Sequence, residues 1–139
     1  MLNNVFKIWG ERHRILLDEK NEMDVLLLKK GTFCSKHRHV YKDNTFILIS
    51  GKVVIETEFG NKVLNLMMDS FTVKPPLIHR FNVIEDSIMI EIASVKKGII
   101  NPDDIIRTKQ GGRYYNGIEM TENELREKGM LELWDIMEI

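Results

Sequence analysis

Two histidines in this sequence lie one residue apart, a spacing at which two side chains of a β-strand can bind the same metal ion. They are His37 and His39, and the stretch that holds them is bounded by Gly31 and Gly51. Side chains alternate between the two faces of a strand, so residues i and i+2 project from the same face. Because neutral imidazole nitrogen is a ligand for Zn, Fe, Ni and Cu, this pair predicts a metal site.

A third histidine, His79 in the stretch KPPLIHRF, would extend the ligand set if its strand folds back beside the first one. Three neutral nitrogens would leave coordination positions open for water or a substrate. His13 is the fourth histidine and lies in a polar stretch without a partner at metal-binding spacing, so we expect it on the surface. The candidate metal ligands are therefore His37, His39 and His79.

Short apolar runs that could position these histidines recur along the chain, with turn residues and no helical pattern between them. Strands at such spacing are typical of a β-sandwich or a β-barrel. The first two runs, joined by a polar connection at 10–13, predict an edge hairpin. The sequence thus predicts an all-β fold with strands at residues 5–9, 14–18, 23–30, 45–50, 52–58, 61–67, 70–75, 79–83 and 87–94.

The character of the chain changes after Gly98. A turn and a short extended piece lead into a Gly-rich loop at 109–117, and Thr121 and Glu124 have the spacing of a helix-capping box. Apolar residues at helical spacing follow, so the pattern predicts a helix over 121–139, which Gly129 could break in two. We expect a single domain, with a barrel at 1–118 and a helical tail at 119–139.

Length and charge narrow the classes of function. A chain of 139 residues suits one domain with one hydrophobic core. The 20 basic and 21 acidic residues give a net charge of -1, which favours neither nucleic acid nor an anionic membrane as a partner. No run approaches the ~20 apolar residues that a membrane helix needs.

Cys34 is the single cysteine, which excludes an internal disulfide and leads us to expect a reducing, cytoplasmic setting. No base is identifiable beside it, so we expect a packed side chain rather than a nucleophile. The runs at 23–30 and 45–50 are apolar on both faces, and such strands must be covered twice. One face would line the barrel and a second subunit could cover the other, which predicts a homodimer.

The histidine spacing resembles the first signature of the cupin superfamily, G-x5-H-x-H-x4-E-x6-G. The two glycines and two histidines match it, whereas Asn44 stands where the family has Glu. The stretch DSFTVKPPLIHRFNV is similar to the second cupin signature and places His79 at its metal-binding histidine. The resemblance implies a double-stranded β-helix, or jelly-roll barrel, that holds a divalent metal ion through His37, His39, His79 and Asn44.

A narrower resemblance runs from FKIWGE to NPDDIIRTKQGGR. It is to the cupin domain of type II mannose-6-phosphate isomerases, which have a W-G-x opening, a Q-x-H-x4-E metal strand, an H-R pair, an I-E-V strand and a D-D-I-V-R tail in this order. His37 stands at the family's Gln, and His39 and His79 keep its histidines. The resemblance implies aldose–ketose isomerisation of a phosphorylated sugar, with Glu91 as the catalytic base and Arg107 as a second catalytic residue.

Three features of the site stay open at this level. Asn44 could coordinate through its amide oxygen or only orient a bound water. Three nitrogen ligands favour Zn, with Fe, Ni and Mn as alternatives. Glu91 faces the barrel only if the alternating isoleucines on its strand face outward. Lys36, Arg38 and Arg80 alternate with the ligands, so we expect them to point away from the metal into solvent.

The sequence therefore predicts a metal-binding cupin that acts on or binds a small molecule, with a phosphorylated sugar as one candidate. Three alternatives remain open: an Fe-dependent dioxygenase, a non-catalytic sugar-binding or regulatory module, and a barrel kept only for assembly. The absence of a carboxylate from the ligand set slightly favours a reaction other than isomerisation.

Overall fold

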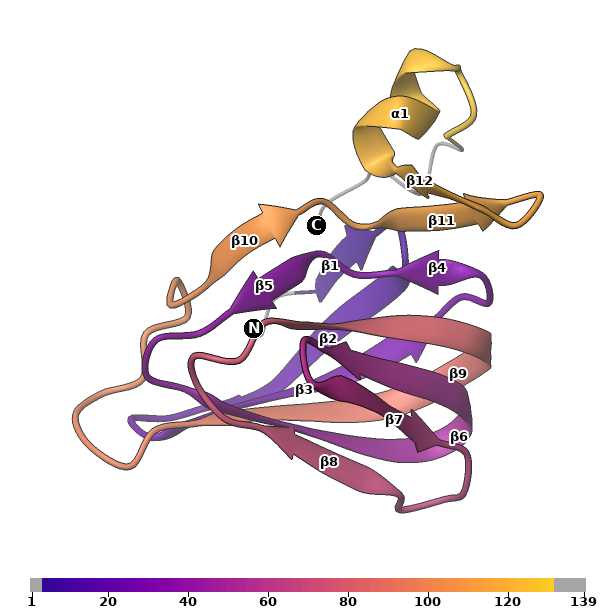
Figure 1. The fold of residues 1–139 in the computed structure, drawn as a ribbon. Coiled ribbons are helices and arrows are strands. Elements are labelled where there is room, and N and C mark those ends of the chain that lie inside the picture. The colour runs from indigo at the N-terminus through magenta and orange to yellow at the C-terminus, as the bar shows by residue number, and fades with distance from the viewer. Residues whose placement is uncertain (1–3, 132–139) are drawn as a thin grey trace.

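The computed structural model describes residues 4–131 and is a β-barrel with one short helix (Figure 1). The predicted all-β architecture and the helix near the C-terminus are confirmed. The elements are β1 (Asn4–Lys7), β2 (Gly10–Leu17), β3 (Asn21–Leu28), β4 (Thr32–Phe33), β5 (Lys36–Arg38), β6 (Asp43–Thr57), β7 (Gly60–Leu64), β8 (Ser70–Val73), β9 (His79–Ser94), β10 (Ile106–Lys109), β11 (Gly112–Tyr115), β12 (Ile118–Thr121) and α1 (Glu122–Glu127).

The long strands β6 and β9 form the centre of the barrel. They pair antiparallel from Asp43 opposite Ser94 to Thr57 opposite His79. The barrel has two walls, and both long strands run through each of them. One wall contains the first half of β6 and the second half of β9, together with β1, β2, β3 and β8. The other wall contains the remaining halves, together with β4, β5, β7 and β10–β12. Two pairs of predicted strands, 45–50 with 52–58 and 79–83 with 87–94, are thus two continuous strands that bend.

The bend lies where the β6–β9 register shifts, between Leu48 and Val53. A bulge leaves a residue unpaired and lets a strand turn from one wall into the next. Gly51 has a φ of 96°, and a Cβ at this position would lie 2.1 Å from Ser87 Oγ and 2.5 Å from the carbonyl oxygen of Asp86. Since only glycine fits here, the last glycine of the histidine motif serves the bend.

The inward-facing side chains divide the barrel into an apolar end and a polar end. On β3, Leu26 and Leu28 are buried at one end, whereas Glu22 and Asp24 are buried at the other. The apolar end is filled by the buried core residues Leu26, Leu28, Cys34, Phe46, Leu48, Val53, Ile55, Leu64, Val73, Phe81, Val83 and Met89. The charged side chains therefore gather at the opposite end, where the candidate site lies.

The segment predicted as a Gly-rich loop, 109–117, instead contributes to β10 and to the antiparallel hairpin of β11 and β12. A Cβ at Gly112 would lie 1.9 Å from the carbonyl oxygen of Met120. Glycine within a strand can mark such a close approach of two backbones. The glycine that suggested a loop is therefore needed for strand pairing.

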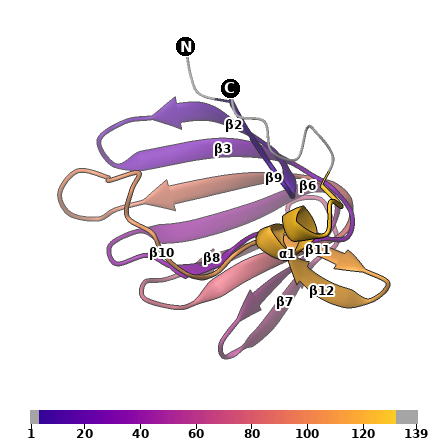
Figure 2. The same cartoon turned by 90° about the horizontal axis from the view of Figure 1, so that it is seen from above.

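Helix α1 begins at the predicted capping box, in which the Thr121 side chain accepts a hydrogen bond from the Glu124 backbone N–H. It ends at Glu127, shortly before Gly129, which has a φ of 66°. Residues 132–139 of the predicted helix lie outside the described residues. Seen from above, α1 lies on the β11–β12 hairpin (Figure 2).

The predicted edge hairpin is present as β1 and β2, although its connection is displaced. The turn falls at residues 8–9, and the polar stretch expected to connect the two strands, residues 10–13, is the start of β2. His13 is consequently a strand residue, partly exposed, with Nε2 3.4 Å from Glu11 Oε1. It takes no part in the histidine cluster.

Candidate metal centre

Strand pairing brings the three predicted histidines together. β5 carries His37 and pairs with the first residue of β9, so His37 lies opposite His79, and His39 follows β5 directly. The ring centroids are 4.5 Å apart for His37 and His79, 5.1 Å for His37 and His39, and 5.6 Å for His39 and His79. One ligand nitrogen from each ring lies within 4.8 Å of the other two. All three are buried.

Backbone carbonyl groups fix the orientation of each ring. His37 Nδ1 lies 2.8 Å from the carbonyl oxygen of Ser35. His39 Nδ1 lies 2.6 Å from that of Asp104, and His79 Nδ1 lies 2.9 Å from that of Leu77. A carbonyl oxygen only accepts, so each Nδ1 carries the hydrogen and each Nε2 keeps its lone pair. Metal-binding histidines are typically held through their second nitrogen in this way.

Burial keeps the rings in the form that binds a metal. Together with the smaller effect of neighbouring histidines, it lowers the pKa of His37 to about 3 and that of His79 to about 4. Burial also lowers the pKa of His39. Neutral imidazole is the ligating form. His79 Nε2 is buried without a hydrogen-bond partner in the described part of the chain, which is an unfavourable state that a bound ion would relieve. The donor set therefore fits a divalent metal ion.

Asn44, on β6, lies directly beside the three rings. Its Nδ2 is 3.2 Å from His39 Nε2 and 3.2 Å from Glu91 Oε2, so the amide connects the histidines to that carboxyl group. Its Oδ1 is buried and has no hydrogen-bond partner among residues 4–131. In this orientation the amide N–H of Asn44 donates a hydrogen bond to the lone pair of His39 Nε2. An amide turned by 180° would direct Oδ1 there instead.

Glu91 faces the interior of the barrel. On β9 its neighbours Met89 and Ala93 are buried on the same face, whereas Ile88 and the following isoleucines project outward. The ambiguity that the alternation left open is thus decided. Burial raises the pKa of Glu91 to about 7, and the negative charge of Asp24 contributes to the rise. A carboxyl group of this kind can both accept and release a proton near neutral pH.

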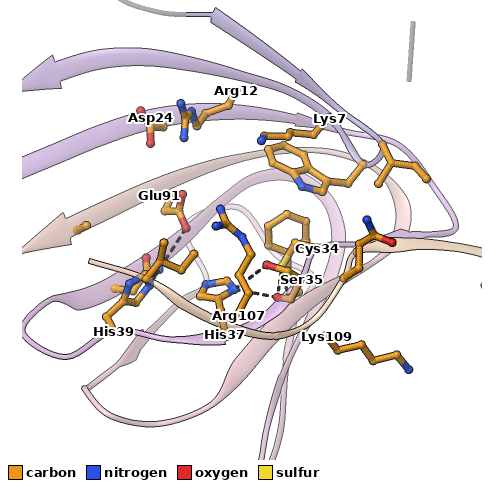
Figure 3. Close-up of a pocket in the computed structure, with 18 of the residues that line it drawn as sticks. Lys7, Arg12, Asp24, Cys34, Ser35, His37, His39, Glu91, Arg107 and Lys109 are labelled. Atoms are coloured by element: carbon orange, nitrogen blue, oxygen red, sulfur yellow. Dashed lines mark hydrogen bonds between the residues drawn. The ribbon is translucent and has the colours of Figure 1, made fainter. Parts of the chain in front are cut away.

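A cavity of about 900 Å³ opens beside the histidines (Figure 3). It is lined by every predicted site residue except the buried His79. Arg107 lies on β10 opposite His37 on β5, and its exposed side chain enters the cavity above the His37 ring. The volume is in the range of sites for small molecules.

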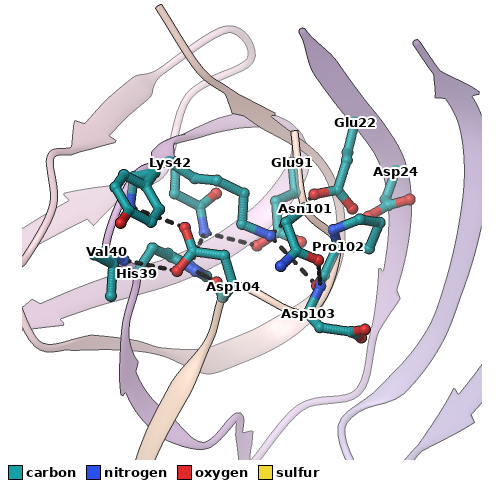
Figure 4. Close-up of polar contacts among 12 residues, drawn as sticks. Glu22, Asp24, His39, Val40, Lys42, Glu91, Asn101, Pro102, Asp103 and Asp104 are labelled. Carbon is teal, nitrogen blue, oxygen red and sulfur yellow. Dashed lines mark hydrogen bonds and ion pairs between the residues drawn. The ribbon is translucent and has the colours of Figure 1, made fainter. Parts of the chain in front are cut away.

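The loop that follows β9 holds His39 in place through Asp104, and the sequence analysis did not predict this role. The two carboxylate oxygens of Asp104 accept hydrogen bonds from the N–H groups of Val40 and Tyr41, at 2.8 and 2.9 Å, and its carbonyl oxygen binds His39 (Figure 4). Nothing local to the histidine motif signals this contact. Asp104 did, however, stand in the D-D-I stretch that resembles the isomerase tail.

The expectation that Arg80 lies in solvent is wrong. Arg80 is buried, pairs with Glu56 and Glu119, and stacks over the Phe33 ring with its guanidinium carbon 4.6 Å from the ring centroid. Strand alternation gives the face on which a side chain lies, but not what covers that face. Here β12 supplies Glu119 and covers it. Lys36 and Arg38 are half-buried.

Comparisons with known proteins show a fold and no close relative. No family model and no curated protein matches the sequence. KdgF from Halomonas sp. has a TM-score of 0.57 at 19% identity, over 63% of this chain and 81% of that one. A Klebsiella pneumoniae protein with a double-stranded β-helix domain has a TM-score of 0.59 at 17% identity, over 71% and 84%. A variant of Streptomyces PAC13, determined with uridine, has a TM-score of 0.64 at 16% identity, over 77% and 84%.

At these identities the likeness shows the fold alone. The chain has a double-stranded β-helix fold, as the resemblance of its histidine motif to the cupin signature implied. These neighbours do not support the narrower resemblance to mannose-6-phosphate isomerases. Fold and site together define a double-stranded β-helix barrel whose three histidines could bind a metal ion. Within residues 4–131, no helix is both long and apolar enough to cross a membrane.

Proposed function

We propose that this protein is a metal-dependent cupin enzyme that transfers a proton between adjacent carbon atoms of a small polar molecule, as an aldose–ketose isomerase does. One observation carries the proposal: three Nε2 lone pairs converge, and each is set by a backbone carbonyl group on Nδ1. His37, His39 and His79 would hold the ion. Zn is favoured by the nitrogen ligands, with Fe, Ni or Mn as alternatives.

The other predicted site residues have separate roles in this proposal. When bound, a divalent ion supplies polarisation of the carbonyl and hydroxyl oxygens of a ligand. Turned by 180°, Asn44 would offer its amide oxygen to the ion, whereas in its present orientation it donates to Glu91 and could only orient a bound water. Glu91, bonded to Asn44 inside the cavity, removes a proton from one substrate carbon and returns it to the next. Arg107 holds the substrate at the cavity mouth through its guanidinium group.

A phosphorylated sugar is the first substrate to test. The support is the resemblance of the Glu91 strand and the Arg107 tail to the sugar-phosphate isomerases, together with the cavity volume of about 900 Å³. The uridine in the PAC13 structure is a small molecule carried by the same fold. Each of these favours a small-molecule ligand for this barrel.

Metal content is the first measurement. Protein purified without an affinity tag is analysed for metals beside the His37→Ala, His39→Ala double variant and a His13→Ala control. We expect near-stoichiometric metal in the wild type and in the control, because His13 lies outside the cluster, and a loss in the double variant. Near-zero metal in all three would leave only a structural or binding role for the barrel.

Turnover is the second measurement. The metal-loaded protein should interconvert mannose 6-phosphate and fructose 6-phosphate, and His39→Ala should abolish the activity while His13→Ala keeps it. Absence of turnover with every metal would exclude the isomerase. A three-histidine set without a carboxylate also suits an Fe-dependent dioxygenase, and oxygen consumption with the Fe-loaded protein alone would identify that reaction. Ligand-induced stabilisation without turnover would identify a binding module.

We also propose a homodimer formed through the outer face of β2, β3, β9 and β6. Leu27 lies opposite Ile88 in the β3–β9 pair, and these two side chains are 36% and 38% exposed. Leu16 on the neighbouring β2 lies opposite Met23 of β3 and is 40% exposed. A contiguous apolar face of this kind typically marks an interface, and a second copy related by twofold symmetry would cover it.

A further inference from the structure

Arg12 places in the cavity a positive charge that the proposed chemistry does not use. It lies on β2, and Figure 3 shows its side chain beside Asp24 inside the same cavity as Glu91 and Arg107. Its Nε is buried and makes no hydrogen bond within residues 4–131. A guanidinium keeps its charge at all relevant pH values. The side chain is only half-buried, and its charge also acts on Glu91. Because the guanidinium has no carboxylate in ion-pair contact within the described residues, its N–H groups are suited to a negatively charged ligand.

The carboxylates near Arg12 make their closest contacts with other groups, although the Arg12 charge also acts on Glu91. Arg14 Nε lies 2.9 Å from Asp24 Oδ1, and Arg14 Nη2 lies 2.8 Å from Glu22 Oε2. The second oxygen of Glu22 is 2.9 Å from Lys42 Nζ (Figure 4). Glu91 accepts a hydrogen bond from Asn44. The acidic wall of the cavity is thus largely neutralised by Arg14 and Lys42.

The other basic side chains that line the cavity differ in whether they form an ion pair with a carboxylate. Lys109 bonds Glu119, and Arg126 Nη2 lies 3.4 Å from Glu122 Oε1. No carboxylate within the described residues forms an ion pair with Arg12 or Arg107. These two arginines enter from different strands, β2 and β10, and line the same cavity.

We propose that Arg12, together with Arg107, forms an anion subsite that selects ligands bearing a phosphate or carboxylate group. Arg12 binds the anionic group in the interior, and Arg107 binds it from the cavity mouth. Planar guanidinium groups bind such oxyanions through paired, charge-assisted hydrogen bonds. This inference rests on the proposed function in one respect: it assigns a class of ligand to the same cavity. Arg12 itself matches no residue of the motifs that suggested an isomerase.

The test compares three ligands with one six-carbon scaffold: glucose 6-phosphate, gluconate and glucose. Binding to the metal-loaded full-length protein is measured by calorimetry, without any requirement for turnover. We expect one or both anions to bind at least about 10-fold more tightly than glucose, because hydrogen bonds to charged groups are the stronger ones. The stronger of the two anions identifies phosphate or carboxylate as the preferred group.

Substitutions then assign the preference to the two arginines. Arg12→Gln should lose about 10- to 100-fold in affinity for the anion, with unchanged glucose binding and unchanged metal content. Arg12→Lys should keep part of the affinity, since it keeps the charge. Lys109→Gln is the matched control and should stay within about 2-fold of wild type, since Lys109 already has Glu119 as a partner. If Arg12→Gln does not fold, the exposed Arg107→Gln carries the test and should lose the same preference.

Equal binding of glucose and the two anions by the wild type would overturn the proposal. So would an anion preference that survives in both Arg12→Gln and Arg107→Gln. The two hypotheses fail separately in this design. Arg12-dependent anion binding without isomerisation would remove the proposed reaction and keep the subsite, whereas turnover that is insensitive to Arg12 would keep the reaction and remove the subsite.

Discussion

His39 and Asp104 are joined by a 2.6 Å hydrogen bond between the imidazole Nδ1 and the backbone carbonyl oxygen. The Asp104 carboxylate also accepts from the N–H groups of Val40 and Tyr41, the two residues that follow His39. The loop after β9 therefore fixes both the ring and the backbone of one candidate ligand. It does so without any contact to the cavity from the Asp104 side chain.

This relationship predicts a metal-binding defect in Asp104→Ala. Without the carboxylate, two backbone N–H groups lose their acceptors and the loop no longer holds the His39 ring. We expect metal affinity to fall about 10- to 100-fold, the usual effect of losing a residue that orients a ligand. Competition with a chelator of known affinity measures the change. The neighbouring exposed Asp103→Ala is the control, and equal affinities in the two variants would contradict the role given to Asp104.

Asn44→Glu tests the fourth position of the ligand set. A carboxylate there would add a charged oxygen ligand, so we expect metal affinity to rise about 10-fold or more. In the metal-free protein the same change places a second carboxyl group next to Glu91, where Asn44 now donates at 3.2 Å. The free energy of unfolding should then fall by roughly 1–3 kcal/mol. Calorimetric melting with and without metal measures both effects. Metal affinity equal to that of the wild type would place position 44 outside the shell.

Glu119→Gln tests how much the ion pair with the buried Arg80 contributes to stability, and this contribution should depend on pH. Hydrogen bonds from Arg80, at 2.8 and 2.9 Å, lower the pKa of Glu119 to about 2. Because this pKa is lower in the folded than in the unfolded state, the stabilisation is complete above about pH 4.5 and is lost as the pH falls toward 2. At pH 7 the variant should be less stable by roughly 1–3 kcal/mol.

Urea denaturation at pH 7, 4 and 3 measures this difference between Glu119→Gln and wild type. The difference should be largest at pH 7 and should shrink in each step toward acid. Glu85→Gln, an exposed change on β9, should stay within about 0.5 kcal/mol of wild type. A difference for Glu119→Gln that is constant with pH would show that the charge of Glu119 is not the source of its contribution.

Cys34 should be chemically inert in the folded protein. Burial raises the pKa of its thiol to about 12, and its Sγ accepts a hydrogen bond from the Phe81 N–H. The thiolate is the reactive form, so at pH 8 we expect labelling by a disulfide reagent at least about 100-fold slower than for a free cysteine. Absorbance of the released thiolate follows the reaction, and urea should restore a normal rate. Immediate labelling of the native protein would reveal an open path to Cys34.

Ile88→Lys should convert the proposed dimer into a monomer. The charge would lie within the outer apolar face, opposite Leu27, where desolvation of an unpaired ammonium group is strongly unfavourable. Light scattering after size-exclusion chromatography gives the mass of each variant. Val63→Lys on β7, a site that is 46% exposed, is the matched control and should stay dimeric. A wild type that is monomeric at all concentrations would exclude this interface.

Local periodicity determined much of the site from the sequence. The H-x-H spacing placed His37 and His39 on one face of a strand. The Thr121 and Glu124 spacing located the start of α1. Each of these features depends on a few consecutive residues, whose side-chain directions follow from the geometry of their own strand or helix.

Tertiary structure decided which groups those side chains meet. On β9 both faces carry apolar residues, so only closure of the barrel showed that Glu91 points inward and Ile88 outward. Alternation directed Arg80 away from the histidines, but β12 was needed to bury it against Glu119. Asp104 and Arg12 gained their roles in the same way, because burial and hydrogen-bond partners are set by strands and loops far away in the chain. Sequence determined direction, and packing of distant segments determined environment.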